Sequence, residues 1–306
     1  MSFAEIFDRP RLAAIVCGAT ATGLGLAWMA AAGAPTRMLA VNAAALAIGL
    51  MLLPALDALL GERSRLRGIA LLAMAGILCA TAFLGTPVEG ATRWISVGSL
   101  VIQPGMIVLP LLVCAQARRP DRTTTAALLL AVTATALQPD RALAGMALAG
   151  IAAIALIKTE RTTYGLLAVA GVAFAITMLF PDRQGAMPYV DQILRTAFDV
   201  DLLAGAAVWA GSAILLVPAC VAMRAKTETR AVACAFAAVW AAAILAALLG
   251  NYPTPLVGYS GSAVLGYVLS LSQFPGRKAS RSTDRSEAEI RAQDDETSML
   301  PLAALA

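Results

Sequence analysis

Acid–base chemistry in this chain can fall only to Asp, Glu, Lys, Tyr or water, because its 306 residues include no histidine. That absence excludes histidine-based triads, histidine metal ligands and histidine proton switches. The carboxylates of Asp199 and Asp201 stand at the start of a long apolar run. A carboxylate at such a partly dehydrated position can take a proton as a general base. The alternative is that Asp199 lies on the solvent-exposed face of a short surface helix.

Most other polar residues that could bind a ligand occur in four segments between apolar runs. These are 90–104 with Arg93, Trp94 and Gln103; the turn Gln138-Pro139-Asp140-Arg141; 181–201; and 251–263 with Tyr259, Ser260 and Ser262. Polar groups near membrane depth tend to line a protein-walled cavity, because lipid would leave them unsatisfied. If the four segments share one face, they form a single outward-facing site. The alternative is four independent solvated loops.

The elements that position these residues are expected to be membrane-spanning helices. Hydrophobic residues make up 59% of the chain, charged residues only 14%, and the mean hydropathy is +0.77. Soluble domains average about 25% charged residues. Only helices and closed barrels satisfy their backbone groups in a bilayer, and barrel strands would alternate polar and apolar residues. The unbroken apolar runs therefore predict an all-α transmembrane bundle.

The apolar runs predict about ten spans, since a span needs roughly 20 apolar residues. The predicted spans are 12–33, 38–60, 66–86, 101–117, 123–138, 141–157, 162–180, 201–223, 229–250 and 255–272. They form a transmembrane domain over 1–272, followed by a polar segment 273–306 that we expect to be a disordered cytoplasmic tail.

The basic residues predict the orientation, because cytoplasmic loops near spans collect Lys and Arg. All but five of the 23 basic residues fall on the side of the N-terminus; the exceptions are Arg37, Arg93, Arg141, Arg183 and Arg195. We therefore expect a multi-pass membrane protein with both termini in the cytoplasm.

A short amphipathic helix is predicted before span eight. Tyr189, Ile193 and Ala197 recur with a helical period, and so do Asp191, Arg195 and Asp199 on the other side. Such a helix would lie in the outer membrane interface with its apolar face on lipid or on the bundle.

Four stretches resemble motifs of the SEDS family (shape, elongation, division and sporulation), which comprises FtsW-, RodA- and SpoVE-type proteins. Segment 90–104 is similar to the family's G-A-R-R-W-I…Q-P-S-E stretch, and 138–140 to its Q-P-D-L-G-T turn. Segment 185–198 is similar to its G-Y-Q-x-x-Q-S-L-x-A helix, and 253–265 to its P-x-P-F-x-S-Y-G-G-S-S-L stretch. The motifs occur in the family's order, and the resemblance covers residues 10–272.

The resemblance implies a lipid II glycosyltransferase of the bacterial inner (cytoplasmic) membrane that polymerises peptidoglycan from an undecaprenyl-linked precursor, in cell division or cell shape. Its partner would be a class B penicillin-binding transpeptidase. It implies Asp201 as the catalytic base, with Asp199 as the alternative. Substrate-binding residues would be Arg93, Trp94, Gln103, Asp140, Arg141, Tyr259, Ser260 and Ser262. No metal ligand, certain cofactor or nucleic-acid partner is expected, and a divalent cation that steadies the diphosphate is left open.

The chain also departs from the family pattern. In place of Q-P-S-E-L-A-K it has residues 103–109, Q-P-G-M-I-V-L, so an acidic and a basic residue are both replaced by apolar ones. Their joint loss resembles the removal of a buried ion pair, since one left alone would be costly. Two alternatives therefore stay open besides the active or weakened enzyme. They are a catalytically inactive scaffold or lipid-carrier-binding partner of a transpeptidase, and a transporter or flippase.

Overall fold

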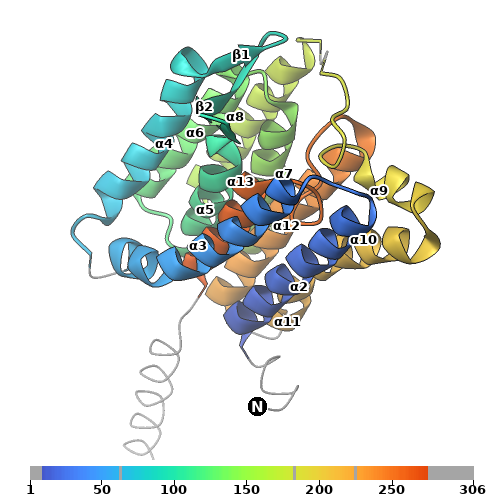
Figure 1. Ribbon diagram of the computed structural model, residues 1–306. Coiled ribbons are helices and arrows are strands. Elements are labelled where there is room, and N and C mark those ends of the chain that lie inside the picture. Colours follow the sequence, from blue (N-terminus) through green and yellow to red (C-terminus); the bar gives the residue numbers. More distant parts are fainter. Residues whose placement is uncertain (1–8, 62–63, 182–183, 224–225, 275–306) are drawn as a thin grey trace, which may run out of the picture. The chain divides into compact units, whose positions relative to one another are not determined.

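The computed structural model describes residues 9–61, 64–181, 184–223 and 226–274, and its main elements are apolar helices (Figure 1). The first eight predicted spans correspond to α2 (Pro10–Ala31), α3 (Thr36–Leu60), α4 (Arg67–Leu84), α5 (Pro104–Arg118), α6 (Arg122–Leu137), α7 (Arg141–Ile157), α8 (Arg161–Met178) and the pair α10 (Leu202–Ile214) and α11 (Val217–Ala222). The last two are α12 (Thr227–Leu249) and α13 (Gly261–Ser270), which continues into the 3-10 turn η2 (Leu271–Gln273). The all-α bundle of about ten helices is confirmed.

By length and composition, six of these helical segments can cross a membrane. They are α2, α3, α4, α8, α10 with α11, and α12. The helices α5, α6 and α7 are apolar but shorter. The protein is therefore a multi-pass membrane protein, in which long and short apolar helices pack together.

Helix α5 lies inside the bundle, where it packs against α4, α6, α7, α12 and α13 (Figure 1). Its approach to α13 is unusually close, since a Cβ added at Gly266 would lie 1.9 Å from the carbonyl oxygen of Met106. Only glycine fits at such a crossing. The remaining helices pack around this centre, with α7 against α12 and α8, and α2 against α10 and α11.

The connectors after the first, third, fifth, seventh and ninth spans lie at one end of the bundle, which we call the connector face, and hydrogen bonds link them. It is formed by segments 32–35, 85–103, 138–140, 179–201 apart from residues 182 and 183, and 250–260. The hydroxyl of Tyr189 donates to the carbonyl of Ala32 at 3.2 Å, and the guanidinium of Arg37 donates to the carbonyl of Ser99. At the other end, Arg67 pairs with Asp121 at 2.6 Å.

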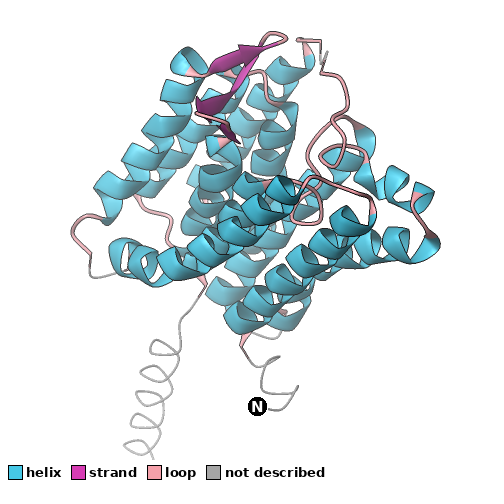
Figure 2. Ribbon diagram, in the orientation of Figure 1, coloured by secondary structure: helices cyan, strands magenta, loops and turns pink. Residues whose placement is uncertain are grey.

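The connector between α4 and α5 forms a small antiparallel sheet that the sequence analysis did not predict (Figure 2). Its strands are β1 (Thr86–Val88), β2 (Ala91–Val97) and β3 (Leu100–Ile102), in that order, with Thr86 opposite Trp94 and Ile95 opposite Ile102. Positive φ angles at Glu89, Gly90 and Gly98 make the two tight turns. Because β3 ends at Ile102, α5 begins three residues later than the predicted span.

The predicted amphipathic helix is present but short, as α9 (Ile193–Thr196) and the 3-10 turn η1 (Ala197–Asp199). Tyr189 and Gln192 have φ angles of 63° and 58°, and two left-handed residues prevent a helix from starting earlier. Asp191 is buried and accepts from the backbone N–H of Met187 at 2.9 Å, so it does not belong to a wet face.

Two residues of the predicted tail belong to the bundle. Gln273 and Phe274 are buried, and the ring of Phe274 packs edge-on against Phe236. The rest of the predicted tail, residues 275–306, lies outside the described residues.

Candidate functional site

The connectors 179–201 and 250–260 are tied together by backbone and side-chain hydrogen bonds. The backbone N–H of Tyr259 donates to the carbonyl of Tyr189 at 2.7 Å, and that of Thr254 donates to Val190 at 3.0 Å. The amide Nε2 of Gln192 donates to Oδ1 of Asn251 at 2.7 Å. Two of the four polar segments therefore form one structure.

The other two polar segments meet in a cluster of the buried Arg93, Gln103 and Asp140 with the half-buried Ser262, which we call the buried cluster. The Nε of Arg93 lies 3.7 Å from Oδ2 of Asp140, and their side chains are 4% and 0% exposed. Gln103 donates to the same Oδ2 at 3.0 Å, and its backbone N–H donates to Oγ of Ser262 at 2.9 Å. The cluster thus joins the sheet connector, the 138–140 turn and the start of α13.

The sequence places Asp140 in this cluster because the carboxylate also begins α7. Its Oδ1 accepts from the backbone N–H of Leu143 at 3.0 Å, as an N-cap residue does. Arg93 in turn donates to the carbonyl of Pro139 at 2.6 Å and lies 5.7 Å from the ring centre of Tyr252. Each charge of this pair is therefore met by several partners, which offsets the cost of its burial.

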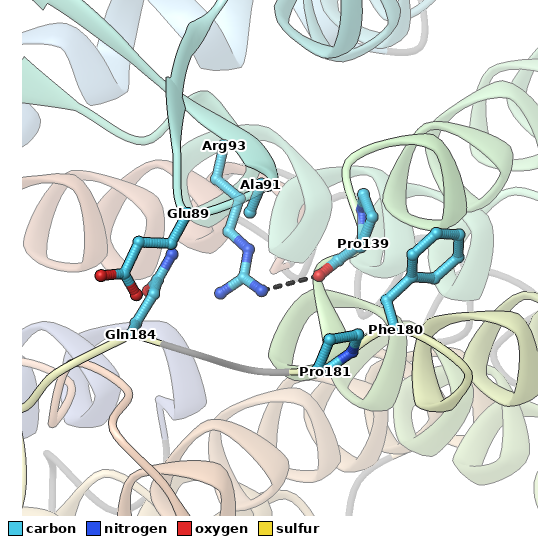
Figure 3. Close-up of a pocket in the computed structure, with 8 residues that line it drawn as sticks. Glu89, Ala91, Arg93, Pro139, Phe180, Pro181 and Gln184 are labelled. Carbon is cyan, nitrogen blue, oxygen red and sulfur yellow. Dashed lines mark hydrogen bonds between the residues drawn. The ribbon is translucent and has the colours of Figure 1, made fainter.

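A small cavity of about 230 Å³ lies beside the buried cluster (Figure 3). The guanidinium of Arg93 reaches across it toward Pro139, with Glu89 and Gln184 on one side and Phe180 and Pro181 on the other. The side-chain Nε2 of Gln184 is buried and has no hydrogen-bond partner among the described residues. The cavity is therefore polar and presents an unused donor.

A larger groove of about 690 Å³ runs along α7 between α8 and α12. At the connector face its lining is polar, with Arg141, Gln184, Gln192, Asn251 and Tyr252. Farther along it is apolar, with Gly145, Leu148, Ala149, Ala152, Phe174, Met178, Leu245 and Leu249 among its residues. Gln184 lines both the small cavity and the groove, so the two adjoin.

The carboxylates expected to act as the general base lie elsewhere on the connector face. Asp201 is exposed and caps α10, since its Oδ1 accepts from the backbone N–H of Ala204 at 2.7 Å. Asp199 is exposed at the end of η1. Neither residue lines the small cavity or the groove.

The remaining predicted residues flank the buried cluster without entering its hydrogen bonds. The half-buried Trp94 has its ring centre 5.8 Å from the guanidinium carbon of Arg93. Ser260 caps α13 through the backbone N–H of Ala263, and Tyr259 is held by its backbone. Arg141 begins α7 and donates from Nε to the carbonyl of Thr177 at 3.3 Å and also to that of Phe180.

Sequence reasoning missed Asn42, which is fully buried within α3. Its Nδ2 donates to the carbonyl of Gly258 at 2.7 Å, and its Oδ1 accepts from the N–H of Ser260 at 3.1 Å. A lone asparagine in an apolar span was the signal that could have found it, because such residues usually bond within the bundle. Tyr252, Gln184 and Asn251 were also missed, and their connectors carried no distinct signal for them.

Beneath the buried cluster the interior is apolar. Met106 and Leu109, which stand where the SEDS motif has its acidic and basic residues, are 3% and 0% exposed. A Cβ added at Gly105 would lie 2.1 Å from Leu143, so α5 and α7 pack closely at this point. The part of the chain that the structure describes has no group of three or more His, Cys, Asp or Glu residues that could hold a metal ion.

Comparison with known proteins gives matches among solved structures alone. No family model matches the chain, and no curated protein matches it by sequence. The crystal structure of the rod shape determining protein RodA of Thermus thermophilus matches with a TM-score of 0.57 and 21% identity, over 85% of this chain and 93% of that one. A mutant of the same protein matches with the same TM-score and identity, over 85% and 94%.

A third match is a chain from a structure described as the structural coordination of polymerization and crosslinking by a peptidoglycan synthase complex. It has a TM-score of 0.56 and 21% identity, over 85% of this chain and 94% of that one. The fold of the present chain is therefore that of RodA, and the resemblance to the SEDS family is confirmed at the level of the fold.

Proposed function

We propose that this RodA-like protein acts in bacterial peptidoglycan synthesis as a lipid II glycosyltransferase. The observation that carries the proposal is the convergence of the four polar segments at one end of a RodA-like bundle. They meet beside a groove that is apolar along its length and polar at its end. A lipid-linked sugar has the same division, with an apolar chain and a charged, hydroxylated head.

In the proposed reaction a sugar hydroxyl oxygen attacks the anomeric carbon of a second lipid-linked sugar. The bond from that carbon to the diphosphate oxygen breaks, and undecaprenyl diphosphate leaves. Asp201 is the proposed base that takes the hydroxyl proton, with Asp199 as the alternative. The exposed side chain of Asp201, fixed at the N-terminus of α10, is accessible to an acceptor sugar from the connector face.

We expect the connector face to be periplasmic, in keeping with the few basic residues on its connectors, and both termini to be cytoplasmic. The expected partner is a class B penicillin-binding transpeptidase. The match to a chain of a peptidoglycan synthase complex supports such a partnership.

A second candidate is a scaffold that binds the lipid carrier or a transpeptidase and has lost catalysis. Two observations favour it. Asp199 and Asp201 line neither cavity, and the interior at Met106 and Leu109 is apolar.

One experiment separates the two candidates. The purified protein, reconstituted with a class B transpeptidase encoded in the same genome, is given lipid II, and the glycan products are resolved by size. If the protein is a glycosyltransferase, we expect the wild type to make polymer. Asp201→Asn should abolish polymer but keep partner binding, and Arg37→Gln should make as much polymer as the wild type. Absence of polymer from the wild-type complex, with the transpeptidase bound, would remove the enzyme and leave the scaffold.

A further inference from the structure

The groove along α7 has the shape and chemistry of a site for an isoprenoid chain that ends in a diphosphate. Its floor is made by small residues that recur on one face of α7: Ala142, Gly145, Ala149 and Ala152. Helices α8 and α12 both pack on α7 and make little contact with each other, so they form two walls. Phe174 and Met178 come from one wall, and Leu245 and Leu249 from the other.

The groove is open to the membrane along its apolar part. Met178, Leu245 and Leu249 are more than half exposed in the bundle, which in a membrane means exposed to lipid. An apolar chain can therefore enter sideways from the bilayer without leaving it. The volume of about 690 Å³ lies within the usual range of ligand pockets.

The two arginines near the polar end differ in their charge balance. Arg93 is paired with the buried Asp140. Arg141 lines the groove, is bound by the carbonyls of Thr177 and Phe180, and makes no ion pair with an acidic side chain among the residues that the structure describes. A cation held in place but not neutralised attracts an anionic ligand.

A second unused group lies at the same end of the groove. The buried Nε2 of Gln184 donates no hydrogen bond within the described residues, although a buried donor normally has a partner. It lies where the small cavity adjoins the groove. A phosphate oxygen bound by Arg141 would give this donor an acceptor.

We infer that the groove between α7, α8 and α12 holds the part of the lipid carrier's undecaprenyl chain that is nearest the diphosphate, with Arg141 and Gln184 binding the diphosphate. The inference rests on the proposed function for the identity of the carrier. It assigns Arg141, and not Arg93, to the recognition of the anion, and it places entry from the membrane between α8 and α12. Arg93 is then a positioning residue that holds the 138–140 turn through Asp140.

Binding of radiolabelled undecaprenyl diphosphate to the full-length protein in phosphatidylcholine nanodiscs tests this assignment. Arg141→Gln should weaken binding about tenfold or more, which is the loss expected for one charge-assisted contact. The matched control Arg37→Gln, which also loses an arginine bound to a carbonyl on the connector face, should bind like the wild type. Uncharged undecaprenol should bind equally well to wild type and Arg141→Gln.

Filling the groove tests the position of the chain. Gly145→Leu should weaken binding of both probes about tenfold or more, because the new side chain occupies the floor beside Phe174. Gly171→Leu is the control, since that glycine lies on the neighbouring α8, outside the groove, with open space around it. A photo-crosslinking benzoylphenylalanine at Leu245 should label the probe, and the same residue at the lipid-exposed Val172 should not.

Three results would overturn the inference. They are unchanged undecaprenyl diphosphate binding by Gly145→Leu and Arg141→Gln, equal crosslinking from both positions, or displacement of the probe by an equal concentration of phosphatidylglycerol, which would mark an ordinary lipid groove. The polymer assay keeps this outcome separate from the proposed function. If the protein makes polymer but the groove variants bind the probe normally, the proposed glycosyltransferase stands and the groove assignment is wrong. If the groove variants lose binding but the protein makes no polymer, the groove assignment stands and the proposed glycosyltransferase is wrong.

Discussion

The Nε of Arg93 and the Oδ2 of Asp140 lie 3.7 Å apart in a site that excludes solvent, and this pair connects the small sheet to the start of α7. Removing one partner leaves the other charge buried and unpaired. We predict that Asp140→Ala lowers the free energy of unfolding by about 3–5 kcal/mol. Adding Arg93→Leu should restore part of this loss. Thermal or chemical unfolding in detergent measures both variants.

The control for that double-mutant cycle is the pair of the exposed Arg119 and the half-buried Asp121. Their side chains are 53% and 33% exposed, and Arg119→Ala should cost no more than about 1 kcal/mol. If Arg93→Leu and Asp140→Ala proved additive, the two charges would not be coupled.

Gly266→Ala should destabilise the crossing of α13 and α5. The added Cβ would meet the carbonyl oxygen of Met106 at 1.9 Å, so the helices must separate, at a cost of about 1–3 kcal/mol. Gly76→Ala, in the middle of α4 with nothing near the new Cβ, should be neutral or stabilise by up to about 1 kcal/mol. Equal unfolding temperatures for the two variants would contradict the crossing.

Asp121 lies in the connector between α5 and α6, and we predict that it makes the free energy of unfolding fall in acid. Burial alone would raise the pKa of its carboxyl, but hydrogen bonds from the backbone and hydroxyl of Thr124 and from Arg67, together with the charge of Arg67, lower that pKa overall. A pKa lower in the folded than in the unfolded chain stabilises the fold above the unfolded value of about 4. This contribution should be lost as pH falls below about 4 and through the folded pKa. Asp121→Asn should flatten that part of the unfolding curve, and an unchanged curve would contradict the assignment.

Cysteine labelling tests the orientation. In a variant whose five cysteines are replaced by alanine, Ser99→Cys on the exposed turn between β2 and β3 should react with a membrane-impermeant thiol reagent at the periplasmic side. Arg119→Cys at the opposite end should react only after the inner membrane is permeabilised. The reverse pattern would place the connector face in the cytoplasm.

Removal of divalent cations should act on the substrate and not on the fold. The described residues offer no cluster of three metal-binding side chains. We propose that a cation that steadies the diphosphate arrives bound to the substrate. We predict that EDTA slows polymerisation, that Mg²⁺ restores it, and that the unfolding temperature of the substrate-free protein does not change. A fall in that temperature with EDTA would indicate a resident metal.

The membrane bundle could be predicted from the sequence because burial in lipid leaves long, unambiguous apolar runs. The same reasoning placed Arg93, Gln103 and Asp140 at one end, and the structure brings all three into contact. The sequence analysis did not predict that Asp140 caps α7, which the structure shows.

The connectors could not be predicted to the same degree, because tertiary hydrogen bonds decide their form. The helical period over 189–199 is genuine in the sequence, yet the left-handed Tyr189 and Gln192 interrupt it where they bond to the 250–260 connector. The three strands at 86–102 are too short to give a clear alternation. The groove was missed because it arises from spacing between α8 and α12, which no single segment reveals.

The connector before α13 is buried and closely packed, like the interior of the bundle. Thr254, Leu256 and Val257 have no exposed surface, and a Cβ added at Gly25 of α2 would lie 2.5 Å from the backbone of Val257. One added or deleted residue there would shift every contact at once, whereas exposed loops absorb such changes. Epitope tags and fluorescent-protein fusions should therefore be tolerated at the turn around Ser99. Insertions between Asn251 and Ser260 should prevent folding, so that connector must keep its length.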